Sequence, residues 1–250
     1  MTVVQGLWVE GPLSDLERLC LVSYLAHGHE VHLYTYGEVA GLPAGVRVLP
    51  AQSVLPASAI FRYRAELGGR YAAFSNLFRY KLLHDRGGWW TDLDMVCLRP
   101  LEIGDDWVFA AERRRDGGTV VATAIIKAPQ GSAFFAGCFE QALHHPQRGA
   151  VWGITGPALL DEAVARAGLA AFVRPPEAFC PIDWFSAKDV FGAVELPAGT
   201  WTVHLWNEVW HRNGWPREPR YPPESLYQRL HRQYAAAHSR SLETCRRGEQ

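Results

Sequence analysis

The chain lacks an excess of charge of one sign. Its 250 residues hold 25 Lys and Arg against 26 Asp and Glu, so the formal net charge is -1. Nucleic acid attracts proteins through clustered basic charge, so this balance argues against nucleic acid as a partner. Charged residues make up 20% of the chain and hydrophobic residues 48%, which is typical of a globular protein.

Paired cysteines and long apolar runs are also missing. The five cysteines are odd in number and none has C-x-x-C spacing, which disfavours a disulfide framework and a zinc site. The first residues show neither the basic nor the apolar region of a signal peptide, and no apolar run is long enough to span a bilayer. We therefore expect a cytoplasmic protein without a transmembrane segment, and a peripheral contact with a membrane stays open.

The first forty residues predict a parallel sheet. Residues 3–9 predict a strand, a helix follows Ser14, and residues 31–36 predict a second strand. Ser14 and Glu17 have the spacing of a capping box, and Gly28 ends the helix. A strand–helix–strand unit of this length implies a right-handed crossover between parallel strands. Because no G-x-G-x-x-G turn follows the first strand, an NAD-type dinucleotide fold is disfavoured.

The rest of the chain continues this alternation of strands and helices. We expect strands at residues 46–49, 107–111, 120–128 and 200–204, and helices at residues 59–73, 75–86, 132–144, 157–167 and 224–238. The helix at 59–73 is broken by Gly68 and Gly69. No linker is long enough to separate two domains, so we expect an α/β fold with residues 1–250 in a single domain.

The most informative stretch runs from Gly87 to Asp94. Its two glycines predict a sharp turn, and the residues after them predict a short strand. Alternation along a strand would place Asp92 and Asp94 on one face, with Leu93 turned into the core. Two neighbouring carboxylates suit a hard divalent cation, which would in turn hold phosphates. Asp-x-Asp alone is a weak signal, since two solvated acids at a strand end give the same pattern.

Four polar features fall at predicted strand ends or near a helix start. They are Trp8, Asn76 with Arg79, Asp92 with Asp94, and His204 with Asn207. Ligands of open α/β sheets bind at the carboxyl ends of the strands. A nucleotide diphospho-sugar needs a flat surface for its base, which Trp8 offers, and a ribose contact, which Asp92 offers. Asp94 with a cation suits the diphosphate, and Asn76 and Arg79 suit the sugar.

Two runs in this region resemble a known family. Residues 75–80 (SNLFRY) and 87–94 (GGWWTDLD) are similar to the core of glycosyltransferases that carry the DXD sugar-binding motif. These include yeast-type mannosyltransferases, α-1,4-galactosyltransferases, capsular polysaccharide transferases and the glucosylating domains of clostridial toxins. Softer matches lie at residues 7–11 and 204–207, so the resemblance spans most of the chain.

The resemblance implies a GT-A type fold with a Rossmann-like, mostly parallel sheet. It implies transfer of a hexose from a nucleotide diphospho-sugar to a glycan or other hydroxyl acceptor, with Mn²⁺ or Mg²⁺ and with retention of anomeric configuration. Residues 1–100 would form the nucleotide-sugar-binding half and residues 101–250 the acceptor-side half. Polysaccharide biosynthesis is the expected setting. The donor stays open between a UDP-sugar and a GDP-sugar, because stacking on a tryptophan does not depend on the base.

The resemblance also implies roles for single residues. The expected catalytic residues are Arg79, Asp92 and Asp94, and the expected metal ligands are Asp92, Asp94 and His204. The expected substrate-binding residues are Trp8, Asn76, Arg79, Gly88, Trp90, Asp92, Trp206 and Asn207. One position departs from the family, which usually has Asp where this chain has Asn76, so a charge-assisted hydrogen bond is lost there.

Other interpretations of the sequence remain. A non-catalytic module that binds nucleotide-sugars or glycans would share the fold, and Asn76 keeps that alternative open. A metal-dependent phosphohydrolase would need a nucleophilic Asp at the end of the first strand, where this chain has none. Trp184, Trp206, Trp210 and Trp215 either line an acceptor groove or belong to the core. His204 is equally explained as a strand-end histidine that bonds to the backbone.

Overall fold

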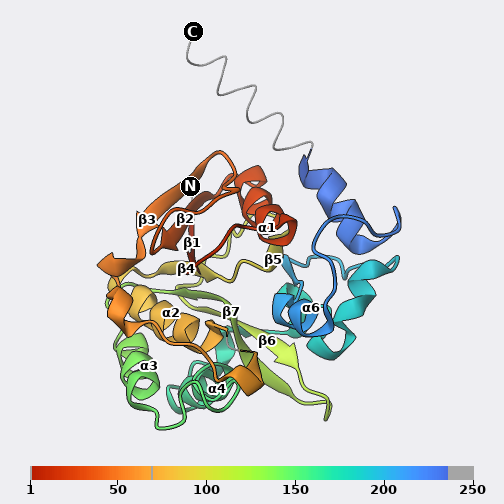
Figure 1. Ribbon diagram of the computed structural model, residues 1–250. Coiled ribbons are helices and arrows are strands. Elements are labelled where there is room, and N and C mark those ends of the chain that lie inside the picture. Colours follow the sequence, from red (N-terminus) through yellow and green to blue (C-terminus); the bar gives the residue numbers. More distant parts are fainter. Residues whose placement is uncertain (1, 69, 236–250) are drawn as a thin grey trace.

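One central sheet combines strands from both halves of the chain (Figure 1). The computed structural model describes residues 2–68 and 70–235. Seven strands have the order β3-β2-β1-β4-β7-β6-β8. Their bounds are β1 (Val3–Trp8), β2 (Glu30–Thr35), β3 (Val46–Pro50), β4 (Gly88–Thr91), β6 (Val108–Arg113), β7 (Thr119–Ala128) and β8 (Val173–Arg174). The first four are parallel, whereas β7 runs antiparallel to both β4 and β6. This confirms the expected α/β fold with a mostly parallel sheet.

The predicted strand–helix–strand unit is present at the start of the chain. Helix α1 (Asp15–Ala26) begins with the predicted capping box between Ser14 and Glu17. Gly28, with φ +76°, turns the chain into β2, which pairs with β1 along its whole length. Local sequence signals therefore determine the first crossover.

Helices cover both faces of the central sheet. Helices α2 (Ala72–Arg86), α3 (Ala133–His144) and α4 (Pro157–Arg166) lie together in the lower left of Figure 1. Their apolar side chains form one core cluster with Trp90, Phe109 and Ile126 of the sheet. On the other face, Leu21 and Tyr24 of α1 pack with Val31 and Leu33 of β2. Each face of the sheet is thus buried by helices, as parallel strands require.

A second, two-stranded sheet lies beside α1 and was not predicted as a sheet. Strand β5 (Met95–Cys97) pairs antiparallel with β9 (Thr202–His204), so that Met95 lies opposite His204. Around it lie the helices α5 (Pro176–Phe179) and α6 (Asn207–Asn213) and the 3-10 segment η5 (Trp184–Phe191). The β5–β9 pairing brings the end of the chain next to the Asp-x-Asp stretch.

One predicted element is wrong and another is confirmed in part. The helix expected at residues 59–73 is wrong: the described residues from 59 to the start of α2 at Ala72 contain only the short 3-10 turn η3 (Ala65–Leu67) and the end of η2 (Ala57–Ala59). Another 3-10 turn, η1 (Ala51–Ser53), lies before them. A further such turn, η4 (Ala170–Phe172), precedes β8. The C-terminal helix is present over residues 226–235, and the remainder of its expected range lies outside the described residues. None of the described helices is long and apolar enough to cross a membrane.

Candidate active site

A pocket of about 470 Å³ opens at the carboxyl ends of β1 and β4. It brings together five residues that the sequence singled out separately, namely Trp8, Arg79, Asp92, Asp94 and Asn207. This is the edge at which open α/β sheets bind their ligands. The pocket therefore confirms that these residues converge, although the chain distance between the first and the last is large.

The two aspartates lie in a turn rather than in a strand. Strand β4 ends at Thr91, and the backbone N–H of Asp92 donates to the carbonyl of Ala124 at 2.7 Å. The N–H of Met95 donates back to the carbonyl of Asp92 at 3.3 Å, which closes the turn before β5. The period-two argument that placed both carboxylates on one strand face is thus wrong. The turn nevertheless directs both of them to the same pocket.

Asp92 is held by a buried arginine. The Nη2 atom of Arg79 donates to Oδ1 of Asp92 at 2.9 Å, and Nε1 of Trp90 donates to the same oxygen at 3.0 Å. Arg79 is only 3% exposed, also donates to Ser75 and to the Thr123 carbonyl, and lies over the Trp90 ring. Burial raises the pKa of Asp92 to about 6, although the Arg79 charge opposes this shift. Above that pH the pair is ionised.

Asp94 is held by a histidine and by a backbone amide. Nε2 of His204 lies 3.1 Å from Oδ2 of Asp94, and the N–H of Asn207 donates to the same oxygen at 2.9 Å. Burial favours a higher pKa for Asp94, but the charge and hydrogen bond of His204 outweigh it and the pKa is lowered. Burial likewise opposes protonation of His204, yet Asp94 raises its pKa well above the ordinary value. The pair is therefore an imidazolium that donates to a carboxylate.

Two carboxylates with free lone pairs fit a hard divalent cation. The protein's hydrogen bonds converge on Oδ1 of Asp92 and on Oδ2 of Asp94, so each carboxylate can offer its other oxygen. Mg²⁺ is commonly held by one or two carboxylates together with substrate phosphates. No group of three or more His, Cys, Asp or Glu side chains surrounds a common point in residues 2–68 and 70–235. Because its Nε2 faces Asp94, His204 fits an orienting role better than that of a ligand.

Several expected substrate-binding residues do not line this pocket. Asn76 is buried and packs against Gly156, where an added Cβ would meet Nδ2 of Asn76 at 2.7 Å. Trp90 is buried in the core and reaches the site only through its bond to Asp92. Trp206 stacks on the His204 ring, with 3.6 Å between the ring centroids. Trp90 and Trp206 thus contact the site residues Asp92 and His204 from the protein interior, whereas Asn76 contacts Gly156.

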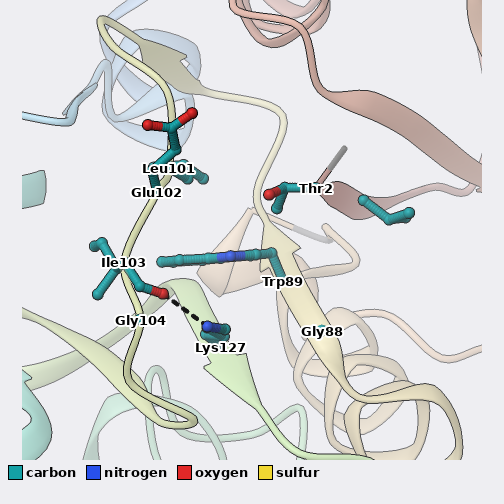
Figure 2. Close-up of a pocket in the computed structure, with 9 residues that line it drawn as sticks. Thr2, Gly88, Trp89, Leu101, Glu102, Ile103, Gly104 and Lys127 are labelled. Atoms are coloured by element: carbon teal, nitrogen blue, oxygen red, sulfur yellow. Dashed lines mark hydrogen bonds between the residues drawn. The ribbon is translucent and has the colours of Figure 1, made fainter.

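Gly88 lies at the opposite end of β4 from Asp92. It begins β4 and lines a second pocket of about 440 Å³, together with Thr2, Trp89 and Lys127. Figure 2 shows the Trp89 ring in this pocket between Ile103 and Thr2, and the Lys127 ammonium bonded to a backbone carbonyl. The four residue steps from Gly88 to Asp92 span about 13 Å along the strand direction. Gly88 therefore does not line the pocket that holds Asp92 and Asp94, and its contact with the donor stays a prediction.

The aromatic residues proposed for an acceptor groove have different environments. Trp210 is fully buried, Trp206 is 9% exposed, and Trp184 is 36% exposed with the Arg115 guanidinium 4.7 Å above its ring. Trp215 is half-buried and meets Phe191 of η5 edge to face. The core interpretation thus holds for Trp210, whereas Trp184 is exposed and its place in an acceptor groove stays a prediction. Trp152, which the sequence gave no reason to select, is 41% exposed.

Sequence reasoning missed three acids near the site. Glu10 and Glu208 line the pocket, and each is paired with arginine: Glu10 with Arg62, and Glu208 with Arg70 and Arg212. Glu112 is the next-to-last residue of β6, and burial raises its pKa to about 7, although the nearby His204 charge opposes this shift. Glu10 lies in the run at residues 7–11 without a spacing that marks its role, and Glu112 and Glu208 lie outside any motif.

Known families match most of the chain. A model described as "Glycosyltransferase sugar-binding region containing DXD motif" matches residues 54–113, which include Arg79, Asp92 and Asp94. A second, described as "Alpha 1,4-glycosyltransferase conserved region", matches residues 129–240. Both models describe glycosyltransferases, and the first one includes the Asp92-x-Asp94 motif. No curated protein matches the chain.

Solved structures of other glycosyltransferases share the fold. The chain aligns with the glycosyltransferase GlyE of Streptococcus pneumoniae TIGR4 over 98% of its own length and 64% of that chain, at 10% identity and a TM-score of 0.51. The PaToxG glycosyltransferase aligns over 68% of this chain and 71% of its own, at 15% identity and a TM-score of 0.49. The UDP-bound glycosyltransferase domain of the YGT toxin aligns over 69% of this chain and 78% of its own, at 9% identity and a TM-score of 0.48. The likeness to GlyE supports a GT-A type fold. This glycosyltransferase spans about two thirds of GlyE.

Proposed function

We propose that this glycosyltransferase moves a hexose from a UDP- or GDP-sugar to a hydroxyl of a glycan or similar acceptor, with a divalent cation and with retention. The observation that carries the proposal is the convergence of Trp8, Arg79, Asp92 and Asp94 on one pocket. A flat ring, a guanidinium and two carboxylates are the groups that a base and a diphosphate need. The family supplies the reaction class, and the pocket supplies the residues.

Each residue of the pocket has a distinct part in this proposal. Trp8 stacks on the nucleobase, held in place by the bond from its Nε1 to the Gly11 carbonyl at 2.8 Å. Asp92 and Asp94 would hold Mn²⁺ or Mg²⁺, which when bound supplies a Lewis acid for the charge on the diphosphate. Arg79 fixes Asp92 and places positive charge at the same end of the pocket. His204 and Asn207 fix Asp94.

The pairing of the other acids supports retention. An inverting transfer needs a general base beside the acceptor hydroxyl. Glu10 and Glu208, the remaining carboxylates of the pocket, are engaged by arginines. In the proposed reaction the bond from the anomeric carbon to the phosphate oxygen breaks as the acceptor oxygen bonds to that carbon on the same face. The acceptor proton passes to the departing phosphate oxygen.

A donor panel tests the proposal. The protein is incubated with Mn²⁺ and UDP- or GDP-hexoses plus oligosaccharide acceptors, and proton NMR reports the anomeric configuration of the product. We expect transfer that EDTA abolishes and that Asp94→Ala reduces on the order of 100-fold. Asp116→Ala, which removes an exposed acid at the β6–β7 turn, is the matched control.

Three outcomes would contradict the proposal. Nucleotide-sugar binding without turnover would indicate a non-catalytic module, and release of orthophosphate would indicate a phosphohydrolase. Equal transfer by Asp94→Ala and the unmodified protein would show that this carboxylate holds no catalytic cation.

A further inference from the structure

The amide that holds Asp94 comes from a turn in a rare backbone conformation. Trp206 has φ 59° and ψ 50°, and no other non-glycine residue in the described part of the chain has a positive φ. A side chain with a Cβ adopts this region only when its surroundings enforce it. The Trp206 ring is fixed by its bond to the Ile182 carbonyl at 2.8 Å and by stacking on His204. The turn directs the N–H of Asn207 at Asp94.

The side chain of Asn207 lies between opposite charges. Its Nδ2 donates to Oε1 of Glu17 at 2.6 Å, and its Oδ1 accepts from Nε of Arg217 at 2.7 Å. A flipped amide would present its oxygen to a carboxylate and its NH₂ group to a guanidinium. Only one orientation of this amide is therefore compatible with its neighbours. The residue that donates its N–H to Asp94 is thus fixed at both ends of its side chain.

Glu17 has a second task beyond its helix cap. It is 2% exposed, and its Oε2 accepts from the N–H of Ser14 at 2.8 Å and from the Ser14 hydroxyl. A glutamine serves a capping box as well as a glutamate does, so the cap alone does not require a charge here. The contact with Asn207 does require an acceptor at Oε1, because a glutamine whose oxygen faces Ser14 presents NH₂ to the Asn207 NH₂.

We propose that Glu17 is a positioning residue for Asp94. Through Asn207 it holds the N–H that engages Oδ2 of Asp94, which leaves Oδ1 for the cation. The Glu17 and Asn207 side chains meet across 190 residues of sequence. As a statement about the metal site this rests on the proposed function, but the hydrogen bonds of Asn207 can be measured without it.

Two matched variants separate the two tasks of Glu17. E17Q keeps an acceptor for Ser14 and loses the one for Asn207, whereas S14A weakens the cap and leaves the Asn207 contact intact. The first measurement is hydrogen exchange of the backbone N–H of Asn207 in the metal-free protein. The second is Mn²⁺ affinity by electron paramagnetic resonance.

We expect E17Q to speed exchange of the Asn207 backbone N–H about tenfold, because the hydrogen bond from the Asn207 side chain to the charged Glu17 is lost. It should also weaken Mn²⁺ binding about tenfold, as loss of a group that orients a ligand does. S14A should lower Tm as E17Q does, or more, with both readouts unchanged. The double variant E17Q/N207D pairs a donor with an acceptor again, and its exchange should return towards that of the unmodified protein.

Unchanged exchange in E17Q would overturn the proposal, as would equally fast exchange in S14A, which would indicate general loosening of α1. Failure of the unmodified protein to bind Mn²⁺ would contradict the proposed function instead, and the exchange result would still decide the role of Glu17.

Discussion

Replacing Arg79 with methionine removes the cation that holds Asp92 and keeps the apolar part of the side chain. Removing one partner of a buried ion pair costs about 3–5 kcal/mol, because the other charge is left buried. The Asp92 side chain is 25% exposed, so water restores part of its solvation. We therefore expect Arg79→Met to lower the free energy of unfolding by about 3 kcal/mol.

A double-mutant cycle isolates the interaction of this pair. Asp92→Asn keeps an oxygen that accepts from Trp90 and Arg79, and we expect it to cost about 1–2 kcal/mol. The double variant leaves no unpaired carboxylate and should cost about 3 kcal/mol, which gives a coupling energy of about 1–2 kcal/mol. Burial raises the pKa of Asp92 to about 6, so the carboxylate is ionised at pH 7.5 and largely protonated at pH 5. The coupling should therefore shrink at pH 5.

The assay is urea unfolding without divalent cations at both pH values. Arg166→Met is the control, since the Arg166–Glu162 pair on α4 is exposed and such pairs contribute about 0–1 kcal/mol. Additive costs for Arg79→Met and Asp92→Asn at pH 7.5 would refute the reasoning. They would show that the 2.9 Å contact between these side chains contributes nothing beyond their separate environments.

Three further changes test other parts of the molecule. Trp8→Ala should weaken UDP or GDP binding about tenfold in calorimetry, since stacking of a base on an aromatic ring contributes about 1–3 kcal/mol; unaltered affinity would remove Trp8 from the base site. Gly87→Ala should destabilise the protein by about 3 kcal/mol in urea, because φ is +62° and the new Cβ would lie 2.4 Å from the backbone nitrogen of Gln130; a near-neutral effect would contradict that packing. Glu112 has a pKa raised to about 7 by burial, so its contribution to stability is full below pH 4.5 and is lost as pH rises through 7. Glu112→Gln should therefore gain roughly 3 kcal/mol relative to the unmodified protein between pH 4.5 and 7.5, and a pH-independent difference would show that the carboxyl is solvated.

Local signals predicted the first crossover and most helices. The capping box at Ser14 and Glu17, the alternation in β2 and the proline at the start of α4 each act within a few residues. Strand β5 has only three residues and pairs with β9 more than a hundred residues later, so no local pattern predicts it. The period-two pattern places Asp92 and Asp94 on a strand because it contains no sign of the turn that leads into β5.

The motif predicted which acids form the site and gave little information on what holds them. Asp92 and Asp94 carry a spacing that a sequence displays, and Arg79 lies in a matching run. Gly88 belongs to the same run, yet it begins β4 and lines the pocket at the opposite end of that strand. Each strand residue advances the chain by about 3.3 Å. Residues at opposite ends of a strand therefore line different pockets even when one motif contains both.

Glu17 shows why the remaining part of the site could not be predicted. Its place three residues after Ser14 is fully explained by the helix cap, so a sequence gives no reason to look for a second role. The second role requires α1, the β5–β9 sheet and the turn at Trp206 to meet, and that meeting is fixed only by tertiary packing. A residue that satisfies a local rule conceals any non-local task it also performs. The contrast between E17Q and S14A is therefore informative, because it separates the local rule from the contact that the fold adds to it.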